Sequence, residues 1–71
     1  SFEYLPAAKA RAVACIDRLE ALGDYCYNRS IGESHRLELA SWCDAGEMRD
    51  FLYRLDAGDP SGDIYARLVI D

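Results

Sequence analysis

The sequence has little of what small domains usually employ for covalent bracing or for chemistry. Its 71 residues include three cysteines, two prolines and one histidine. An odd number of cysteines leaves at least one thiol unpaired. On one continuous helix, Cys15 and Cys26 would lie about 16 Å apart, beyond the reach of a disulfide. The sequence therefore predicts a domain without disulfides, in which the cysteines act as small apolar residues.

Long apolar runs are also missing. No segment has the apolar length of a signal-peptide core or of a membrane-spanning helix. Unpaired thiols are typical of proteins kept in a reducing compartment. We therefore expect a cytoplasmic protein without a membrane partner.

The residue patterns of catalytic and metal sites are absent too. His35 is the only imidazole, and on one helix it would lie about 12 Å from Cys43, too far for a catalytic dyad. Structural zinc sites usually contain closely spaced cysteine pairs, and no two cysteines here are within four residues of each other. There is no glycine-rich phosphate loop and no H-E-x-x-H sequence. The sequence thus predicts no enzyme, no metal and no cofactor.

Positive charge is scarce. The formal net charge is −5, and residues 44–71 contain seven acidic residues against three arginines. Binding to nucleic acid or to anionic membranes needs clustered Lys and Arg, so neither is an expected direct partner. The acidic second half would instead steer the protein towards a basic partner surface.

Apolar residues and helical spacing are what the chain does contain. The hydrophobic fraction of 51% argues against disorder. From residue 5 to residue 26, apolar residues recur at alternating spacings of three and four, the pattern of one helical face. These residues are Leu5, Ala8, Ala12, Cys15, Leu19, Leu22 and Cys26. The pattern predicts a first helix over residues 5–28.

Three further helices are expected. Ser30 and Glu33 have the spacing of a capping box at the start of a helix over 31–43. Asp44 is a possible N-cap for a helix over 45–57, with a break or kink near Gly46 favoured over one continuous helix. The spacing within 60–70 fits both a strand and a helix, and a helix is expected because a lone strand would need a partner. The predicted fold is all-α: a single domain, 1–71, with a bundle of three to four short helices.

Two surfaces stand out as candidates for contact. A second stripe of small residues on the first helix consists of Ala7, Ala10, Ala14 and Ala21. Small side chains allow another helix to approach closely, so this stripe predicts a homodimer packed through the first helix; the alternative is a plain solvent face. Tyrosine and arginine dominate interface energetics, which favours a partner-binding role for Tyr25, Tyr27, Arg29, Arg49 and Tyr53. The alternative for these residues is that they cover the edges of a thin core.

These features together predict a small acidic protein-interaction module. It would bind a larger partner protein and regulate it by occluding its surface, as inhibitors of bacterial or phage type do. One alternative is an acidic mimic of nucleic acid that occupies a basic groove, for which partner binding would depend strongly on salt. Another is a small Cys-dependent redox protein or enzyme, which requires an accessible thiol of low pKa.

Overall fold

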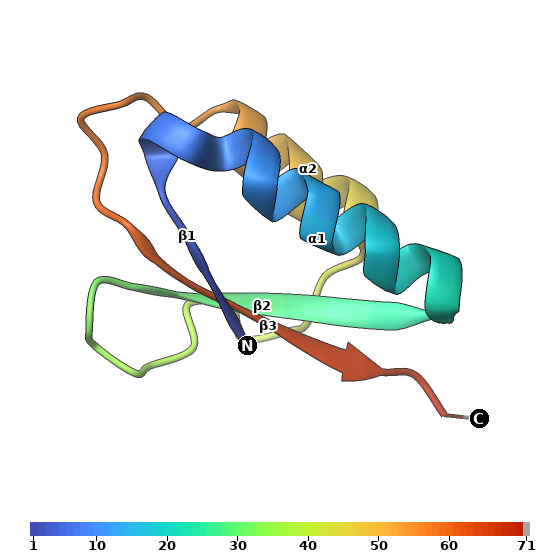
Figure 1. Ribbon diagram of the computed structural model, residues 1–71. Coiled ribbons are helices and arrows are strands. Elements are labelled where there is room, and N and C mark those ends of the chain that lie inside the picture. The colour runs from blue at the N-terminus through green and yellow to red at the C-terminus, as the bar shows by residue number, and fades with distance from the viewer. Residues whose placement is uncertain (71) are drawn as a thin grey trace.

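Two helices lie on one face of a three-stranded antiparallel sheet (Figure 1). The computed structural model describes residues 1–70. Along the chain the elements are strand β1 (Phe2–Tyr4), a 3-10 turn η1 (Pro6–Ala8), helix α1 (Lys9–Leu22), strand β2 (Tyr25–Ile31), helix α2 (Ala45–Tyr53) and strand β3 (Gly62–Leu68).

Strand β3 is the central strand, because the order in the sheet is β1-β3-β2. Both neighbours run antiparallel to it, so β1 and β2 are parallel to each other with β3 between them. Residues opposite one another share a face of the sheet. Ile64 pairs with Phe2 on one side and with Arg29 on the other, and its buried side chain marks this as the face towards the helices.

The core lies between that face of the sheet and the two helices. Its fully buried large side chains come from every regular element except the 3-10 turn: Tyr4, Ile16, Tyr27, Met48, Leu52 and Ile64. The ring of Phe51 meets Tyr4 edge to face at 5.5 Å. Tertiary burial of this kind, more than intrinsic propensity, stabilises short helices and strands.

Helices α1 and α2 pack side by side and run in opposite directions (Figure 1). At one end, Lys9 Nζ donates hydrogen bonds to the backbone oxygens of Tyr53 and Leu55, both at 2.9 Å. A cation at the C-terminal end of a helix satisfies free carbonyls and complements the helix dipole. Further along, Arg49 donates to Asp17 at 2.8 Å. No helix within residues 1–70 combines the length and apolarity needed to cross a membrane.

The all-α prediction is wrong, because two of the predicted helices contain strands. The predicted helix 5–28 ends at Leu22, and β2 begins at Tyr25. Gly23 ends the helix, with its N–H bonded to the backbone oxygen of Leu19. The predicted helix 60–70 is β3. Its strand partners are β1, which precedes the first predicted helix, and β2, which begins within the last turn predicted for that helix.

The predicted helix 31–43 is also wrong, whereas the prediction for 45–57 agrees in part. Ser30 belongs to β2, so no capping box forms, and the chain after it turns through Gly32 and His35, both with positive φ. Segment 32–44 contains no helix. Asp44 does cap α2, and its side chain accepts a hydrogen bond from the N–H of Glu47. That helix is shorter than predicted and ends at Tyr53.

Candidate functional site

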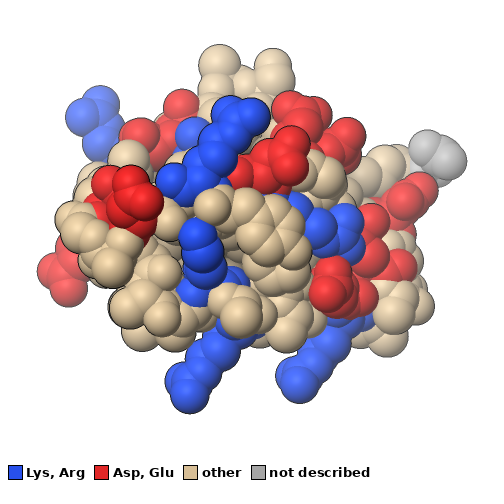
Figure 2. Space-filling view, turned by 90° about the horizontal axis from the view of Figure 1, so that it is seen from above, with Lys and Arg blue, Asp and Glu red and all other residues tan. Residues whose placement is uncertain are grey.

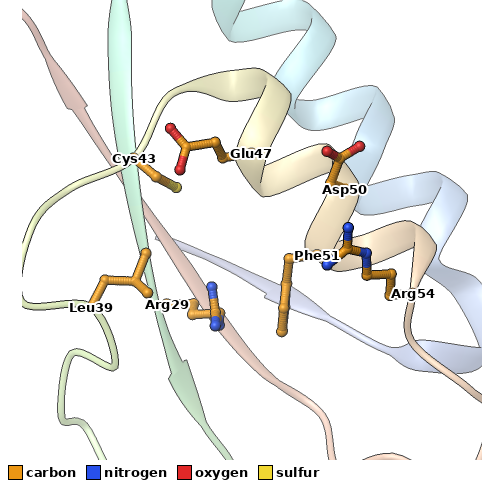
Figure 3. A pocket seen from close by; sticks show the side chains of 7 residues that line it. All are labelled: Arg29, Leu39, Cys43, Glu47, Asp50, Phe51 and Arg54. Atoms are coloured by element: carbon orange, nitrogen blue, oxygen red, sulfur yellow. The ribbon is translucent and has the colours of Figure 1, made fainter.

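A cleft of about 330 Å³ opens between α2 and the segment that follows β2. Figure 3 shows Arg29 and Leu39 on one side, the carboxylates of Glu47 and Asp50 on α2, and Phe51 between the two arginines. The complete lining is Arg29, Leu39, Cys43, Glu47, Asp50, Phe51 and Arg54. The cleft therefore combines an aromatic and an aliphatic surface with two cations and two anions.

The wall opposite α2 is an irregular segment held to the outer edge of β2. Tyr27 and Cys43 exchange two backbone hydrogen bonds, at 2.7 and 2.8 Å. The fully buried side chain of Asn28 binds the backbone of Leu39 twice, donating to its oxygen at 2.9 Å and accepting from its N–H at 3.0 Å. The bonds at Tyr27 satisfy backbone groups of the strand edge, and those at Asn28 satisfy a buried side-chain amide. They fix Leu39 and Cys43 at the mouth of the cleft.

The helical wall is set by the N-cap of α2. Asp44 accepts from the N–H of Glu47 at 2.8 Å, which fixes where the helix begins. Glu47, Asp50 and Arg54 then follow at spacings of three and four, so one side of the helix carries all three charges. All three residues are exposed and their charged groups are reached by water.

Arg29 is the one partly buried charged residue of the cleft. It comes from the helix-facing side of β2, opposite the buried Ile64, and is only partly exposed. Its guanidinium carbon lies 3.8 Å from the centre of the Phe51 ring. Its Nε is shielded from solvent and has no hydrogen-bond partner among residues 1–70, and none of their carboxylates forms an ion pair with it. The cleft thus contains a partly desolvated cation that forms no ion pair within residues 1–70.

Cys43 lines the cleft but is poorly suited to nucleophilic chemistry. Burial raises the pKa of its thiol, and the nearby Glu47 carboxylate raises it further. A thiol must ionise to act as a nucleophile, so Cys43 is protonated at neutral pH. No group of three or more His, Cys, Asp or Glu side chains in the described part of the chain is placed to hold a metal ion.

The residues predicted to bind a partner occupy different environments. Arg29 lines the cleft, whereas Arg49 pairs with Asp17 on the helical surface. Tyr53 is 60% exposed on α2. Tyr25 is partly buried against the core, and Tyr27 is fully buried within it.

Tyr27 belongs to the core in a specific way. Its hydroxyl donates to Glu20 at 2.9 Å, and burial together with this bond raises the pKa of the phenol. A partner could not contact the ring without unfolding the sheet. Among the predicted residues, the structure brings only Arg29 to the cleft and leaves Tyr53 open on the adjacent helix.

Of the alanines predicted to form a dimer interface, three lie on the exposed side of α1 and Ala7 lies in the preceding 3-10 turn η1. Ala7, Ala10, Ala14 and Ala21 are exposed, while Ala12 and Ile16 are the helix residues buried in the core. The helix is therefore covered on one side by this chain. The homodimer stays a prediction.

A separate apolar patch lies at the far end of the sheet. Leu22, Leu68, Val69 and Ile70 are exposed there. The N–H of Val69 bonds to the oxygen of Asp24, which ties this end of β3 to the start of β2. Arg29 pairs with Ile64, four residues before Leu68 in β3, and the patch shares no residue with the lining of the cleft, so the two are distinct surfaces.

Sequence reasoning missed most of the cleft. Glu47, Asp50 and Arg54 have a common helical spacing that could have placed them on one side of α2. Leu39 and Cys43 gave no signal, because their position depends on hydrogen bonds to a strand that was interpreted as helix.

Comparisons with known proteins provide no relative: no family model, no curated protein and no solved structure matches the chain.

Proposed function

We propose that the protein is a protein-interaction module whose contact surface is the cleft together with the exposed side of α2. The observation that carries this proposal is Arg29, a partly buried cation without an ion pair in an open cleft. Buried charges in proteins are normally paired. A group supplied by another molecule is the pairing that this site lacks.

The size and composition of the surface favour a protein as that molecule. A cleft of about 330 Å³ is at the small end for ligand sites and accepts one side chain more readily than a cofactor. Tyr53 stands exposed on the same helix, and arginine and tyrosine are enriched among residues that dominate binding energy. The module would act by covering a surface of its partner, a mode that requires no catalytic group of its own.

The two alternative functions have weaker support. A nucleic-acid mimic needs a surface of one sign, and Figure 2, which looks onto the helices, shows acidic and basic side chains interleaved. A Cys-dependent enzyme needs an ionised thiol, and the thiol in the cleft has a raised pKa.

The experiment that tests the proposal places a photo-crosslinking amino acid at Tyr53 and, as a control, at Arg11 on the outer side of α1. Both residues are exposed. We expect a discrete cross-linked protein from position 53 and none from position 11 in lysate of cells that encode the chain. The captured protein, once purified, should bind Tyr53→Ala and Arg54→Ala at least ten-fold more weakly than Arg11→Ala. Equal cross-linking from both positions, none from either, or equal affinities of all variants would refute the proposal.

A further inference from the structure

Among the four charged residues of the cleft, only Arg29 has a side-chain nitrogen that is shielded from solvent and has no hydrogen-bond partner within residues 1–70. Glu47, Asp50 and Arg54 are exposed, so water solvates their charges. Arg29 is partly buried with its Nε shielded from solvent. The Phe51 ring offers a cation–π contact at 3.8 Å, which is weaker than the solvation that a guanidinium loses on burial. The interaction that the cleft lacks is therefore an ion pair between Arg29 and a negatively charged group.

The rest of the lining limits which anion can meet that demand. A guanidinium binds carboxylate and phosphate equally well in geometric terms, through two parallel hydrogen bonds. Glu47 and Asp50 stand on the facing wall, and a doubly charged phosphate would be repelled by both. The net charge of −5 opposes multiply charged anions further. A single carboxylate is the anion that this cleft tolerates.

Apolar surface beside Arg29 indicates which kind of group should be attached to the carboxylate. Leu39 and the ring of Phe51 flank the guanidinium (Figure 3). A volume of 330 Å³ holds about ten groups the size of a water molecule, at ~30 Å³ each. The cleft thus has room for one side chain or one chain end, with its apolar stem against Leu39 and Phe51.

We infer that the cleft binds a carboxylate on an apolar stem, with Arg29 as its anchor. The inference rests on the proposed function and deepens it: the group inserted by the partner is an acidic side chain or a C-terminal carboxylate. Arg54, on the same α2 wall as Glu47 and Asp50, provides the second positive charge near the site.

The test is an NMR titration of the ¹⁵N-labelled protein, in which the Nε–H resonance of each arginine is followed. The probe is phenylacetate, and phenylacetamide serves as a neutral analogue of the same shape. We expect phenylacetate to shift the Arg29 Nε–H signal and the amides of Leu39 and Phe51, with saturation in the millimolar range that suits so small a ligand. Phenylacetamide and inorganic phosphate should bind at least ten-fold more weakly.

Two variants and one control establish the role of the guanidinium. Arg29→Met should lower phenylacetate affinity at least ten-fold. Arg29→Lys keeps the charge but loses the two-pronged geometry, and should lower the affinity several-fold. Should Arg29→Met fail to fold, Arg29→Lys still decides the question. Arg11→Gln, on the outer side of α1, should bind as the wild type does.

Blocked peptides then distinguish the two sources of the carboxylate. One has an internal Phe-Glu pair and an amidated end, and the other ends in Phe with a free carboxylate. The inference is overturned if neither peptide nor phenylacetate shifts the Arg29 signal, or if phenylacetamide binds as tightly as phenylacetate. It is also overturned if the captured partner loses affinity with Tyr53→Ala but not with Arg29→Met, a result that leaves the proposed function intact. If the cleft binds the carboxylate but no partner protein is captured, the proposed function is refuted and the carboxylate site is supported.

Discussion

Gly62 offers the sharpest test of the strand order, because a single methyl group should decide it. The residue lies in the central strand β3, opposite Tyr4 of β1 and Ile31 of β2. A Cβ added there would overlap the backbone oxygen of Ser30 and would lie 2.8 Å from the hydroxyl oxygen of Tyr4. Neither the strand backbone nor the fully buried tyrosine can move aside without separating β3 from a neighbour.

The expected magnitude follows from the nature of that overlap. Overpacking a well-packed core costs about 1–3 kcal/mol, and more where the obstacle is backbone. A 71-residue domain has a free energy of unfolding of roughly 4–11 kcal/mol. We therefore expect Gly62→Ala to remove at least ~3 kcal/mol, a large part of the total. In the helix predicted from sequence for 60–70, the same substitution would stabilise by about 0.5–1 kcal/mol, so the sign of the change separates the two folds.

Urea unfolding followed by far-UV circular dichroism measures this change. Gly58→Ala is the matched control, because a Cβ at Gly58 meets no atom within 4 Å. We expect the control to stay within about 0.5 kcal/mol of the wild type, as surface substitutions usually do. A Gly62→Ala protein as stable as the control, or more stable, would show that β3 does not lie between β1 and β2.

The remaining predictions concern the core, the cleft wall and self-association. Burial and the hydrogen bond to Glu20 raise the pKa of Tyr27 above its usual value of 10.0. The protonated phenol therefore contributes fully to stability below pH 10, and this contribution is lost as the pH rises further. Urea midpoints measured between about pH 7 and 11 should fall at the alkaline end, and should fall less in Tyr27→Phe. Asn28→Ala leaves the backbone groups of Leu39 without partners and should cost about 2–4 kcal/mol, with hydrogen exchange at the Leu39 amide accelerated more than in the core of α1. Should exchange there match the wild type, the side chain of Asn28 does not hold the cleft wall. If the predicted homodimer forms, light scattering at tens of micromolar protein should give a mass of twice 8.0 kDa. Ala14→Glu should reduce that mass to 8.0 kDa. A monomeric wild-type protein would exclude the homodimer.

The elements that sequence reasoning placed well are those specified locally. Helix α2 follows from an N-cap at Asp44 and from apolar residues at helical spacing, of which Met48 and Leu52 are fully buried. Both signals lie within a few residues of one another, and neither depends on the rest of the fold. Most of α1 was found for the same reason, since its buried residues Ala12 and Ile16 are one turn apart.

The strands failed because their evidence is non-local. In segment 25–31 the residues that face the helices alternate, as in a strand, but Cys26 and the tyrosines also continue the helical spacing of α1. Segment 62–68 also fits the alternation of a strand, but the sequence predicts a helix over 60–70 because no partner strand is evident. The partner that decides the matter, Tyr25 opposite Leu68, is more than forty residues away in the sequence. No local pattern expresses that contact.

The cleft could not be predicted because one of its walls, segment 32–44, was expected to be a helix. The hydrogen bonds of that segment show how the two errors are linked. A helix over 31–43 would have satisfied the backbone groups of its interior internally and would have needed partners only at its two ends. As an irregular segment it must find partners elsewhere, and it finds them along the outer edge of β2, at Tyr27 and Asn28. That attachment places Leu39 on the wall opposite α2, with the guanidinium of Arg29 between Leu39 and Phe51 (Figure 3). The two walls therefore differ in what holds them in place. Helix α2 is held by its own backbone hydrogen bonds and by its face buried in the core. The facing wall is held by the bridge at Cys43, the Glu38–Arg29 backbone bond and the side-chain amide of Asn28. A ligand at Arg29 would meet one rigid wall and one wall secured by few bonds, so the free energy of binding should depend on Asn28 even though that side chain points away from the cleft and binds the backbone instead.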